Sequence, residues 1–260
     1  MNKENQAKII ELVKQTKPLI LQEMAHEKIT EKGAADYVTN VDVAVQNFLK
    51  EALEKEFPEI RLIAEEKENL GLDPDKSYWI LDPIDGTTNL IRDYHLSAVS
   101  LGLYENGEIT FGVVYNPFTE ELFYGAKGEG AYLNGTPIHV SDQPKFKDAV
   151  VSFGSSPYEK NRAKELFPVF YNIFMNCADF RRTGSAALDL CYVACGRQHA
   201  YLEQNLKPWD YSGATVILRE AGGTITDWEN KEPPYLENSD ILACVPQFLE
   251  ILQSLIKKQV

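Results

Sequence analysis

An apolar strand that ends in two aspartates is the feature that most constrains how this chain can fold. The run Trp79–Asn89 reads Trp-Ile-Leu-Asp-Pro-Ile-Asp-Gly-Thr-Thr-Asn. Pro83 ends the strand directly after Asp82, and Asp85 follows three residues later, so both carboxylates can converge at the carboxyl end of one strand. Gly86 lets the backbone approach a ligand, and a helical turn that begins there would offer free N–H groups to a phosphate. Because carboxylates repel an anion unless a cation lies between them, the run predicts a phosphate site built on a hard metal ion.

Other acidic residues allow two interpretations from their local sequence. Glu65 and Glu66 follow an apolar strand, and adjacent strand residues point to opposite faces, so only one of them can enter a site. The alternative is a pair of solvated charges at a strand end. Asp210 either contributes to a site or caps the helix that begins near it. Asp42 either caps the next helix or orients a threonine hydroxyl that helps to activate water.

The order of the predicted elements indicates two halves that meet near residue 145. Before it, we expect helices at 5–28 (kinked by Pro18) and 43–57, then strands at 61–64, 78–81, 98–104, 109–115, 122–125 and 131–133. After it, we expect strands at 150–153, 200–203, 223–226 and 241–244, and helices at 159–174, 185–194, 211–221 and 246–256. Residues 1–145 should therefore form an α+β half with an antiparallel meander, and residues 146–260 an α/β half, packed as one compact unit with a cleft between them.

Charge and composition exclude several classes of protein. The chain carries 26 Lys and Arg against 39 Asp and Glu, a net charge of −13, which disfavours binding to nucleic acid. No apolar run approaches the roughly 20 residues of a membrane span, and the N-terminus lacks the features of a signal peptide. We therefore expect a cytoplasmic protein with no membrane or nucleic-acid partner.

The four cysteines, Cys177, Cys191, Cys195 and Cys244, contain no Cys-x-x-Cys pair. Cys191, Cys195 and His199 have a spacing that could suggest a metal site, but no fourth ligand is evident. We expect four buried, reduced thiols.

Together these motifs resemble the inositol monophosphatase family of magnesium-dependent, lithium-sensitive phosphatases. The resemblance extends over about residues 5 to 257 and rests on Trp79–Asn89, Trp209–Ala214 with Glu220–Gly223, residues 36–42, and Glu65 with Glu66. It implies a layered αβαβα sandwich of the inositol monophosphatase and fructose-bisphosphatase type, usually found as a homodimer.

The resemblance also implies a role for each site residue. The ligands of two or three Mg²⁺ ions would be Glu65, Asp82, the Ile84 carbonyl, Asp85 and Asp210. The catalytic residues would be Glu65 and the pair that orients the attacking water, Asp42 and Thr87. The substrate would contact Asp85, Gly86, Thr87, Gly184, Ser185, Ala186, Glu203 and Asp210.

The activity implied is magnesium-dependent hydrolysis of a small polyol or sugar phosphate, first of all inositol monophosphate, by metal-activated water and without a phosphoenzyme. Leu90 and the stretch 92–95 depart from the family pattern. Glu203 favours a monophosphate, whereas Arg182, next to Arg181, favours a bisphosphate such as fructose 1,6-bisphosphate or the substrate of a 3′(2′),5′-bisphosphate nucleotidase. An inactive, metal-dependent phosphate sensor or regulator is the alternative from another class.

Overall fold

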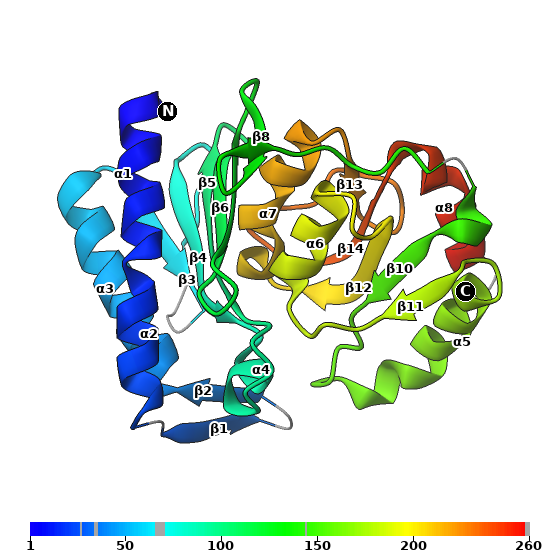
Figure 1. Cartoon of the computed structure of the whole chain (residues 1–260), viewed down its shortest axis with the longest axis horizontal. Helices are drawn as coiled ribbons and strands as arrows, with labels where there is room; N and C mark the ends of the chain where they lie inside the picture. The colour runs from blue at the N-terminus through cyan, green and yellow to red at the C-terminus, as the bar shows by residue number, and fades with distance from the viewer. Residues whose placement is uncertain (27, 34–35, 66–70, 144, 258–260) are drawn as a thin grey trace.

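Five layers in the order αβαβα build the molecule (Figure 1). The computed structural model describes the chain except residues 27, 34–35, 66–70, 144 and 258–260, and the side chains of residues 33 and 36. Helices α1 to α3 form one outer layer, a seven-stranded sheet the second, α6 and α7 the middle, a five-stranded sheet the fourth, and α5 with α8 the other outer layer. The predicted layered sandwich is confirmed.

The N-terminal helices are α1 (Lys3–Lys14), α2 (Thr16–Met24) and α3 (Asn40–Glu56). The predicted kink lies at Gln15, three residues before Pro18, which sits in the first turn of α2, where its missing N–H is tolerated. The helix ends before residue 28 because the chain turns into an unpredicted hairpin, β1 (Ile29–Gly33) with β2 (Asp36–Thr39). Helix α3 begins three residues earlier than predicted, because Thr39 and Asp42 form a capping box.

The first sheet has the strand order β3-β4-β5-β6-β7-β8-β9, and only β3 and β4 pair in parallel. Its meander was predicted, including the turn at Asn106 and Gly107, whose positive φ angles of 53° and 86° suit a tight hairpin. The strands are β3 (Arg61–Ala64), β4 (Tyr78–Asp85), β5 (Ala98–Glu105), β6 (Glu108–Asn116), β7 (Glu121–Ala126), β8 (Gly130–Leu133) and β9 (Thr136–Pro137). The short helix α4 (Thr87–Ile91) follows β4 directly.

The second sheet has the strand order β11-β10-β12-β14-β13, parallel across the first three strands and antiparallel beyond. The strands are β10 (Val150–Phe153), β11 (Asp179–Arg181), β12 (Ala200–Leu206), β13 (Thr224–Thr226) and β14 (Ser239–Cys244). The helices are α5 (Ala163–Phe174), α6 (Ala186–Ala194), α7 (Pro208–Glu220) and α8 (Leu249–Lys257), with short 3₁₀ turns at Phe146–Asp148, Lys160–Arg162 and Pro246–Phe248. Strand β11, three residues long, was not predicted.

Helix α7 belongs to the second half in sequence but packs against β5 and β6 of the first sheet. The contact is made through glycines: a Cβ on Gly112 would lie 2.0 Å from the carbonyl oxygen of Gly213, and one on Gly102 would lie 3.0 Å from the backbone of Ser212. In sequence, the first sheet ends before residue 145 and the second begins after it. We propose residue 145 as the boundary between two halves of one compact unit.

The four thiols are free, as predicted, but only Cys191 and Cys244 are buried. Burial raises the pKa of the Cys244 thiol to about 12. Cys177 and Cys195 are partly exposed because they lie just beyond the ends of α5 and α6, so the prediction of burial was wrong for these two. His199 accepts the backbone N–H of Val150 at 3.0 Å, which is a structural role. No helix within the described ranges is long and apolar enough to cross a bilayer.

Candidate active site

A bulge in β4 brings Asp82 and Asp85 together. Asp82 lies opposite Ser100 of β5 and Asp85 lies opposite Ala98, so β4 contains one more residue than its partner over this interval. In a regular strand, residues three apart would point to opposite faces. The extra residue lets both carboxylates occupy the carboxyl end of β4, where both are buried, with exposures of 2% and 7%.

Asp85 connects β4 to the start of α6. Its Oδ2 accepts the Ser185 hydroxyl and, at 2.8 Å, the backbone N–H of Ala187, while its Oδ1 accepts the N–H of Ala186 at 3.3 Å. Ser185 also caps α6, accepting the N–H of Leu188 at 3.3 Å. Two of the predicted substrate contacts, Ser185 and Ala186, therefore bind Asp85 in this structure.

Asp42 and Thr87 form a hydrogen-bonded pair. The Thr87 hydroxyl lies 3.2 Å from Oδ1 of Asp42 and 3.1 Å from the carbonyl oxygen of Ile84. Oδ2 of Asp42 accepts the backbone N–H of Thr39 at 2.8 Å and its hydroxyl at 2.6 Å. Both interpretations of Asp42 are therefore compatible: one oxygen caps α3 and the other holds Thr87.

Glu65 and Asp210 complete the acidic group. Glu65 follows β3, and its carboxylate pairs at 3.1 Å with Lys32 of β1. Asp210 accepts the N–H of Lys207 at 2.7 Å, so it caps the start of α7, which is one of the two interpretations of this residue. Glu66, predicted as the neighbour that points away, lies outside the described residues.

These carboxylates raise one another's pKa values. Burial raises the pKa of Asp82 well above its usual range, and the charges of Glu65, Asp85, Asp210 and Asp42 raise it further. Burial raises the pKa of Asp85 to about 6, although its hydrogen bonds to Ser185, Ala187 and Ala186 oppose the shift. Burial, then Asp85 and Glu65, raise the pKa of Asp210 well above the ordinary value. Acids from several separate segments thus share one electrostatic environment that a cation would relieve.

The donor set suits magnesium. Within the described ranges, no three or more His, Cys, Asp or Glu side chains are grouped so that they could hold a metal ion. Mg²⁺ usually takes one or two carboxylates and completes its shell with water and substrate phosphate, so an open arrangement of hard oxygen donors fits it. The Ile84 carbonyl adds a further oxygen beside Thr87.

A second wall of the site surrounds Glu203 on β12. Oε2 of Glu203 accepts the Tyr201 hydroxyl at 2.6 Å and Oε1 accepts the N–H of Ser156 at 3.0 Å. Gly154 leaves room for this carboxylate, because a Cβ there would lie 1.8 Å from it. Burial raises the pKa of Glu203, and these two hydrogen bonds and the charge of Arg182 lower it. The supporting residues Tyr201, Ser156 and Gly154 belong to no motif and were not predicted.

Asn89 joins the two halves at the site. Its side-chain amide donates to the carbonyls of Leu96 at 2.7 Å and Thr183 at 2.9 Å. Gly86 adopts a φ of 88°, and a Cβ on it would lie 3.2 Å from the carbonyl oxygen of Gly184. The two glycines therefore face each other across the site. Asn89 ends the Trp79–Asn89 run, which was the one available signal for it.

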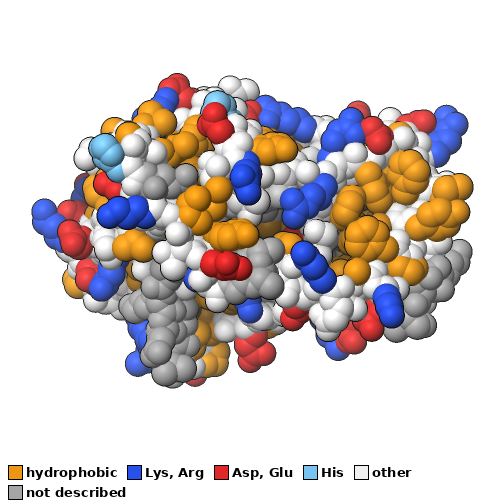
Figure 2. Space-filling model, turned by 90° about the horizontal axis from the view of Figure 1, so that it is seen from below, with side chains coloured by type: hydrophobic (Ala, Val, Ile, Leu, Met, Phe, Trp, Pro, Cys, Tyr) orange, Lys and Arg blue, Asp and Glu red, His pale blue; other side chains and the backbone are white. Residues whose placement is uncertain are grey.

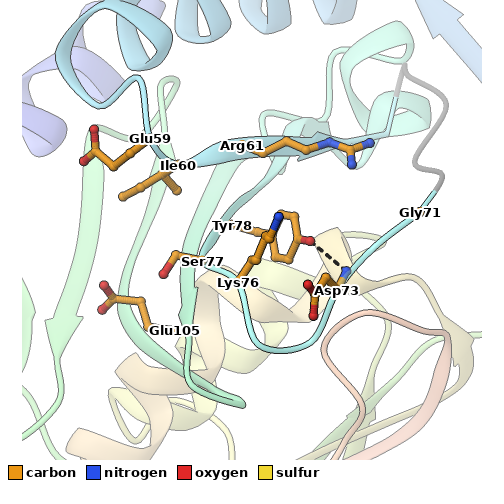
Figure 3. A pocket seen from close by; sticks show the side chains of 9 residues that line it. All are labelled: Glu59, Ile60, Arg61, Gly71, Asp73, Lys76, Ser77, Tyr78 and Glu105. Carbon is orange, nitrogen blue, oxygen red and sulfur yellow. Dashed lines mark hydrogen bonds between the residues drawn. The ribbon is translucent and has the colours of Figure 1, made fainter.

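A separate pocket of about 490 Å³ lies at the amino ends of β3 and β4, opposite the acidic group (Figure 3). There the Asp73 backbone N–H donates to the Tyr78 hydroxyl at 2.8 Å, with Arg61, Lys76 and Glu105 also lining the pocket. Its mixed charges and its position at the far end of β4 separate it from the predicted site.

Asp189 is a buried acid that should make stability depend on pH. It is 1% exposed and accepts the Thr183 hydroxyl at 2.7 Å and the Gln198 amide at 3.1 Å, yet burial raises its pKa to about 7. The folded state therefore binds this proton more tightly than the unfolded state, whose pKa is about 3.9. The stabilising contribution is complete below about pH 4 and is lost as the pH rises to about 7.

We expect the free energy of unfolding of Asp189→Asn to fall less between about pH 4 and about pH 7 than that of the wild type. Urea unfolding at about pH 5 and about pH 7.5 measures it, because the remaining groups are common to both proteins and cancel in the difference. An equal change in the unfolding free energy of the two proteins would contradict the assignment.

Comparison with known proteins identifies the family. The profile of the inositol monophosphatase family matches residues 1–259, so the chain belongs to this family. A relative from Vibrio cholerae named Nus factor SuhB is 38% identical over 223 residues, which cover 85% of this chain and 83% of the relative.

Solved structures agree with that fold. The extragenic suppressor protein suhB from Bartonella henselae superimposes with a TM-score of 0.92 at 30% identity, covering 99% of this chain and 100% of its own. An IMPase/NADP phosphatase complexed with Mg²⁺ and phosphate gives 0.89 at 26% identity, covering 97% and 95%. Staphylococcal inositol monophosphatase-1, soaked in LiCl as an inhibitory complex, gives 0.90 at 26% identity, covering 97% and 94%.

Proposed function

We propose that this protein is a magnesium-dependent phosphoric monoester hydrolase that acts on inositol monophosphate or a similar small polyol phosphate. The observation that carries the proposal is the group of mutually repelling carboxylates beside the Asp42–Thr87 hydrogen bond. The similar structure that contains Mg²⁺ and phosphate supports it. The ligands of two or three ions would be Glu65, Asp82, the Ile84 carbonyl, Asp85 and Asp210.

Bound Mg²⁺ would polarise the phosphoryl group and lower the pKa of the attacking water. The chain's own residues fix the direction of attack. Asp42 is held by Thr39 through one oxygen and holds the Thr87 hydroxyl through the other. Thr87 would align the attacking water, and we assign Glu65 to the same water. Ser185 is 1% exposed and donates to Asp85, which argues against a serine nucleophile and for direct attack by water.

Substrate would lie between the two walls of the site. We assign the phosphate to Gly86 and Thr87, and the hydroxyl groups of the leaving group to Gly184 and Glu203. Asp85 and Asp210 would contact substrate through the metal ions, and Ser185 and Ala186 would line the same turn. Glu203 is an acceptor fixed by Tyr201 and Ser156, which suits a sugar hydroxyl.

Phosphate release from a panel of substrates tests this proposal. The panel is inositol 1-phosphate, fructose 1,6-bisphosphate, a 3′-phosphoadenosine nucleotide and glycerol 2-phosphate, each with magnesium, with chelator, and with lithium added. We expect release to require magnesium and to fall with lithium, with inositol 1-phosphate among the best substrates. Release that continues unchanged in chelator would contradict the mechanism.

A second function, a metal-dependent phosphate sensor or regulator, is favoured by one observation: the relative that is 38% identical is named as a Nus factor. The prediction that this protein has no nucleic-acid partner applies to the phosphatase and would not apply to a regulator of this kind. Calorimetry that detects tight binding of inositol 1-phosphate with Mg²⁺, together with no phosphate release from the panel, would support it over the enzyme.

We also propose a homodimer. Helix α5 exposes a stripe of large apolar side chains at its outer face, and hydrophobic side chains gather on that side of the molecule in Figure 2. The stripe consists of Phe167, Tyr171, Phe174 and, just past the helix, Met175. Burying it against a second copy would remove this surface from water, and sedimentation velocity measures the resulting mass.

A further inference from the structure

Arg182 lies beside the part of the proposed site that we assign to the leaving group. Its Nη2 is 3.5 Å from the Ser155 hydroxyl, and a Cβ on Gly184 would lie 3.0 Å from its Nη1. Its charge also lowers the pKa of the Glu203 carboxyl. The guanidinium thus stands over Gly184, beside both groups assigned to the leaving group.

The neighbouring Arg181 provides a contrast. Arg181 donates to the carboxylate of Asp179 and, at 2.7 Å, to the carbonyl of Phe180, so its charge is compensated on β11. Among the described residues, Arg182 has no ion pair within 4.0 Å, and its one hydrogen bond is the long contact to Ser155. It keeps most of its donors available at the rim of an otherwise acidic site.

The charge of the Arg182 guanidinium can offset the repulsion that a second phosphate would meet in this site. A substrate with a second phosphate would be repelled by Glu203 and by a chain of net charge −13 unless a cation stood at that position. A guanidinium binds a phosphate through parallel N–H donors. Lys and Arg side chains lie across the middle of the face seen in Figure 2, with Asp and Glu side chains among them.

We propose that Arg182 is a specificity residue that extends the substrate range to polyol or nucleoside bisphosphates by binding the phosphate that is not hydrolysed. In this arrangement Glu203 accepts a hydroxyl from the leaving group, and Arg182 meets the second phosphate nearer to solvent. The inference rests on the proposed phosphatase function and names a substrate class for the same site.

The test compares kcat/KM for fructose 1,6-bisphosphate and inositol 1-phosphate in the wild type, Arg182→Gln, Arg182→Lys and the matched control Arg181→Gln. We expect the ratio of bisphosphate to monophosphate kcat/KM to fall about 10-fold or more in Arg182→Gln, because a charge-assisted phosphate contact is lost. The ratio should recover in part in Arg182→Lys and stay near the wild-type ratio in Arg181→Gln. Added salt should lower the wild-type ratio.

The outcomes separate this inference from the proposed function. Magnesium-dependent release from inositol 1-phosphate with an unchanged ratio in Arg182→Gln would overturn the role of Arg182 and leave the phosphatase intact. If the wild type releases no phosphate from any substrate, the proposed function fails, and calorimetry with fructose 1,6-bisphosphate then tests Arg182 alone. Equal affinity of wild type and Arg182→Gln for that probe would overturn the inference.

Discussion

Asp85→Asn should reduce magnesium-dependent phosphate release by at least about 10³-fold, a loss of about 4 kcal/mol of transition-state stabilisation. The substitution removes a charge assigned to the metal ions but keeps the side chain's size. It should also leave the fold intact, because the two stronger donors, Ser185 and Ala187, both bind Oδ2. The single oxygen of asparagine can accept both, and only the 3.3 Å contact with Ala186 is lost.

The same substitution should make the metal-free protein more stable near neutral pH. The pKa of Asp85 is raised to about 6, so its ionised form at higher pH opposes folding, and its charge also raises the pKa values of Asp82 and Asp210. Removing that charge relieves the repulsion. We therefore expect a higher Tm than wild type in chelator and a smaller rise in Tm on adding Mg²⁺.

Thermal unfolding with and without Mg²⁺, run beside the activity assay, measures both effects. Asp75→Asn is the matched control, because it makes the same chemical change at an exposed residue just before the other end of β4. It should behave as wild type in activity and in its response to metal. An Asp85→Asn protein that retains wild-type turnover would refute the assignment of Asp85 to the metal site.

The acidic end of β4 could be predicted because its information is local. Asp82, Pro83 and Asp85 lie within one strand end, and the family resemblance supplied the distant acids. The family resemblance implied the order of the layers, and the apolar periodicity placed most strands and helices within a few residues. The bulge that aligns the two aspartates was not predicted, because it is defined by the register against Ser100 and Ala98 on another strand.

The wall around Glu203 could not be predicted for a similar reason. Tyr201 lies two residues before Glu203 on β12, but Ser156 reaches Glu203 because β10 and β12 pair in parallel, with Ser152 opposite Tyr201. Nothing in a single sequence encodes that register. The direction of the Arg182 side chain also depends on tertiary structure, because the neighbouring Arg181 binds Asp179 whereas Arg182 contacts Ser155. The β1–β2 hairpin was missed because its strands are short and polar, and it is held by the capped start of α3 and by the Lys32–Glu65 pair.

Gly112→Ala should destabilise the protein more than any single substitution in the site. Gly112 lies in β6, where α7 approaches the first sheet, and a methyl group there would sit 2.0 Å from the Gly213 carbonyl oxygen and 2.9 Å from Val216. The 2.0 Å contact joins a Cβ, whose position the backbone fixes, to a backbone oxygen, so no side-chain rotation can relieve it. Helix and sheet must separate, which opens a packed core, and we expect a loss of about 3 kcal/mol or more.

The position of α7 links this packing to the chemistry. Asp210 lies in the first turn of α7, and a Cβ contact must reach at least 3.0 Å to be tolerated, so the helix has to move by about 1 Å. Any Gly112→Ala protein that folds should therefore bind Mg²⁺ more weakly than wild type, because one of the proposed ligands has moved.

Gly125→Ala on β7 is the graded control for this prediction. Its Cβ would lie 3.2 Å from the Ile217 Cα and 3.4 Å from the Gly130 carbonyl oxygen, distances that a shift of a few tenths of an ångström relieves. We expect a cost of about 1 kcal/mol and nearly normal metal binding. Urea unfolding and Mg²⁺ titration of both variants measure the contrast. Equal stability of the two would show that α7 adapts to the sheet freely, and that the glycine contact does not fix the position of Asp210.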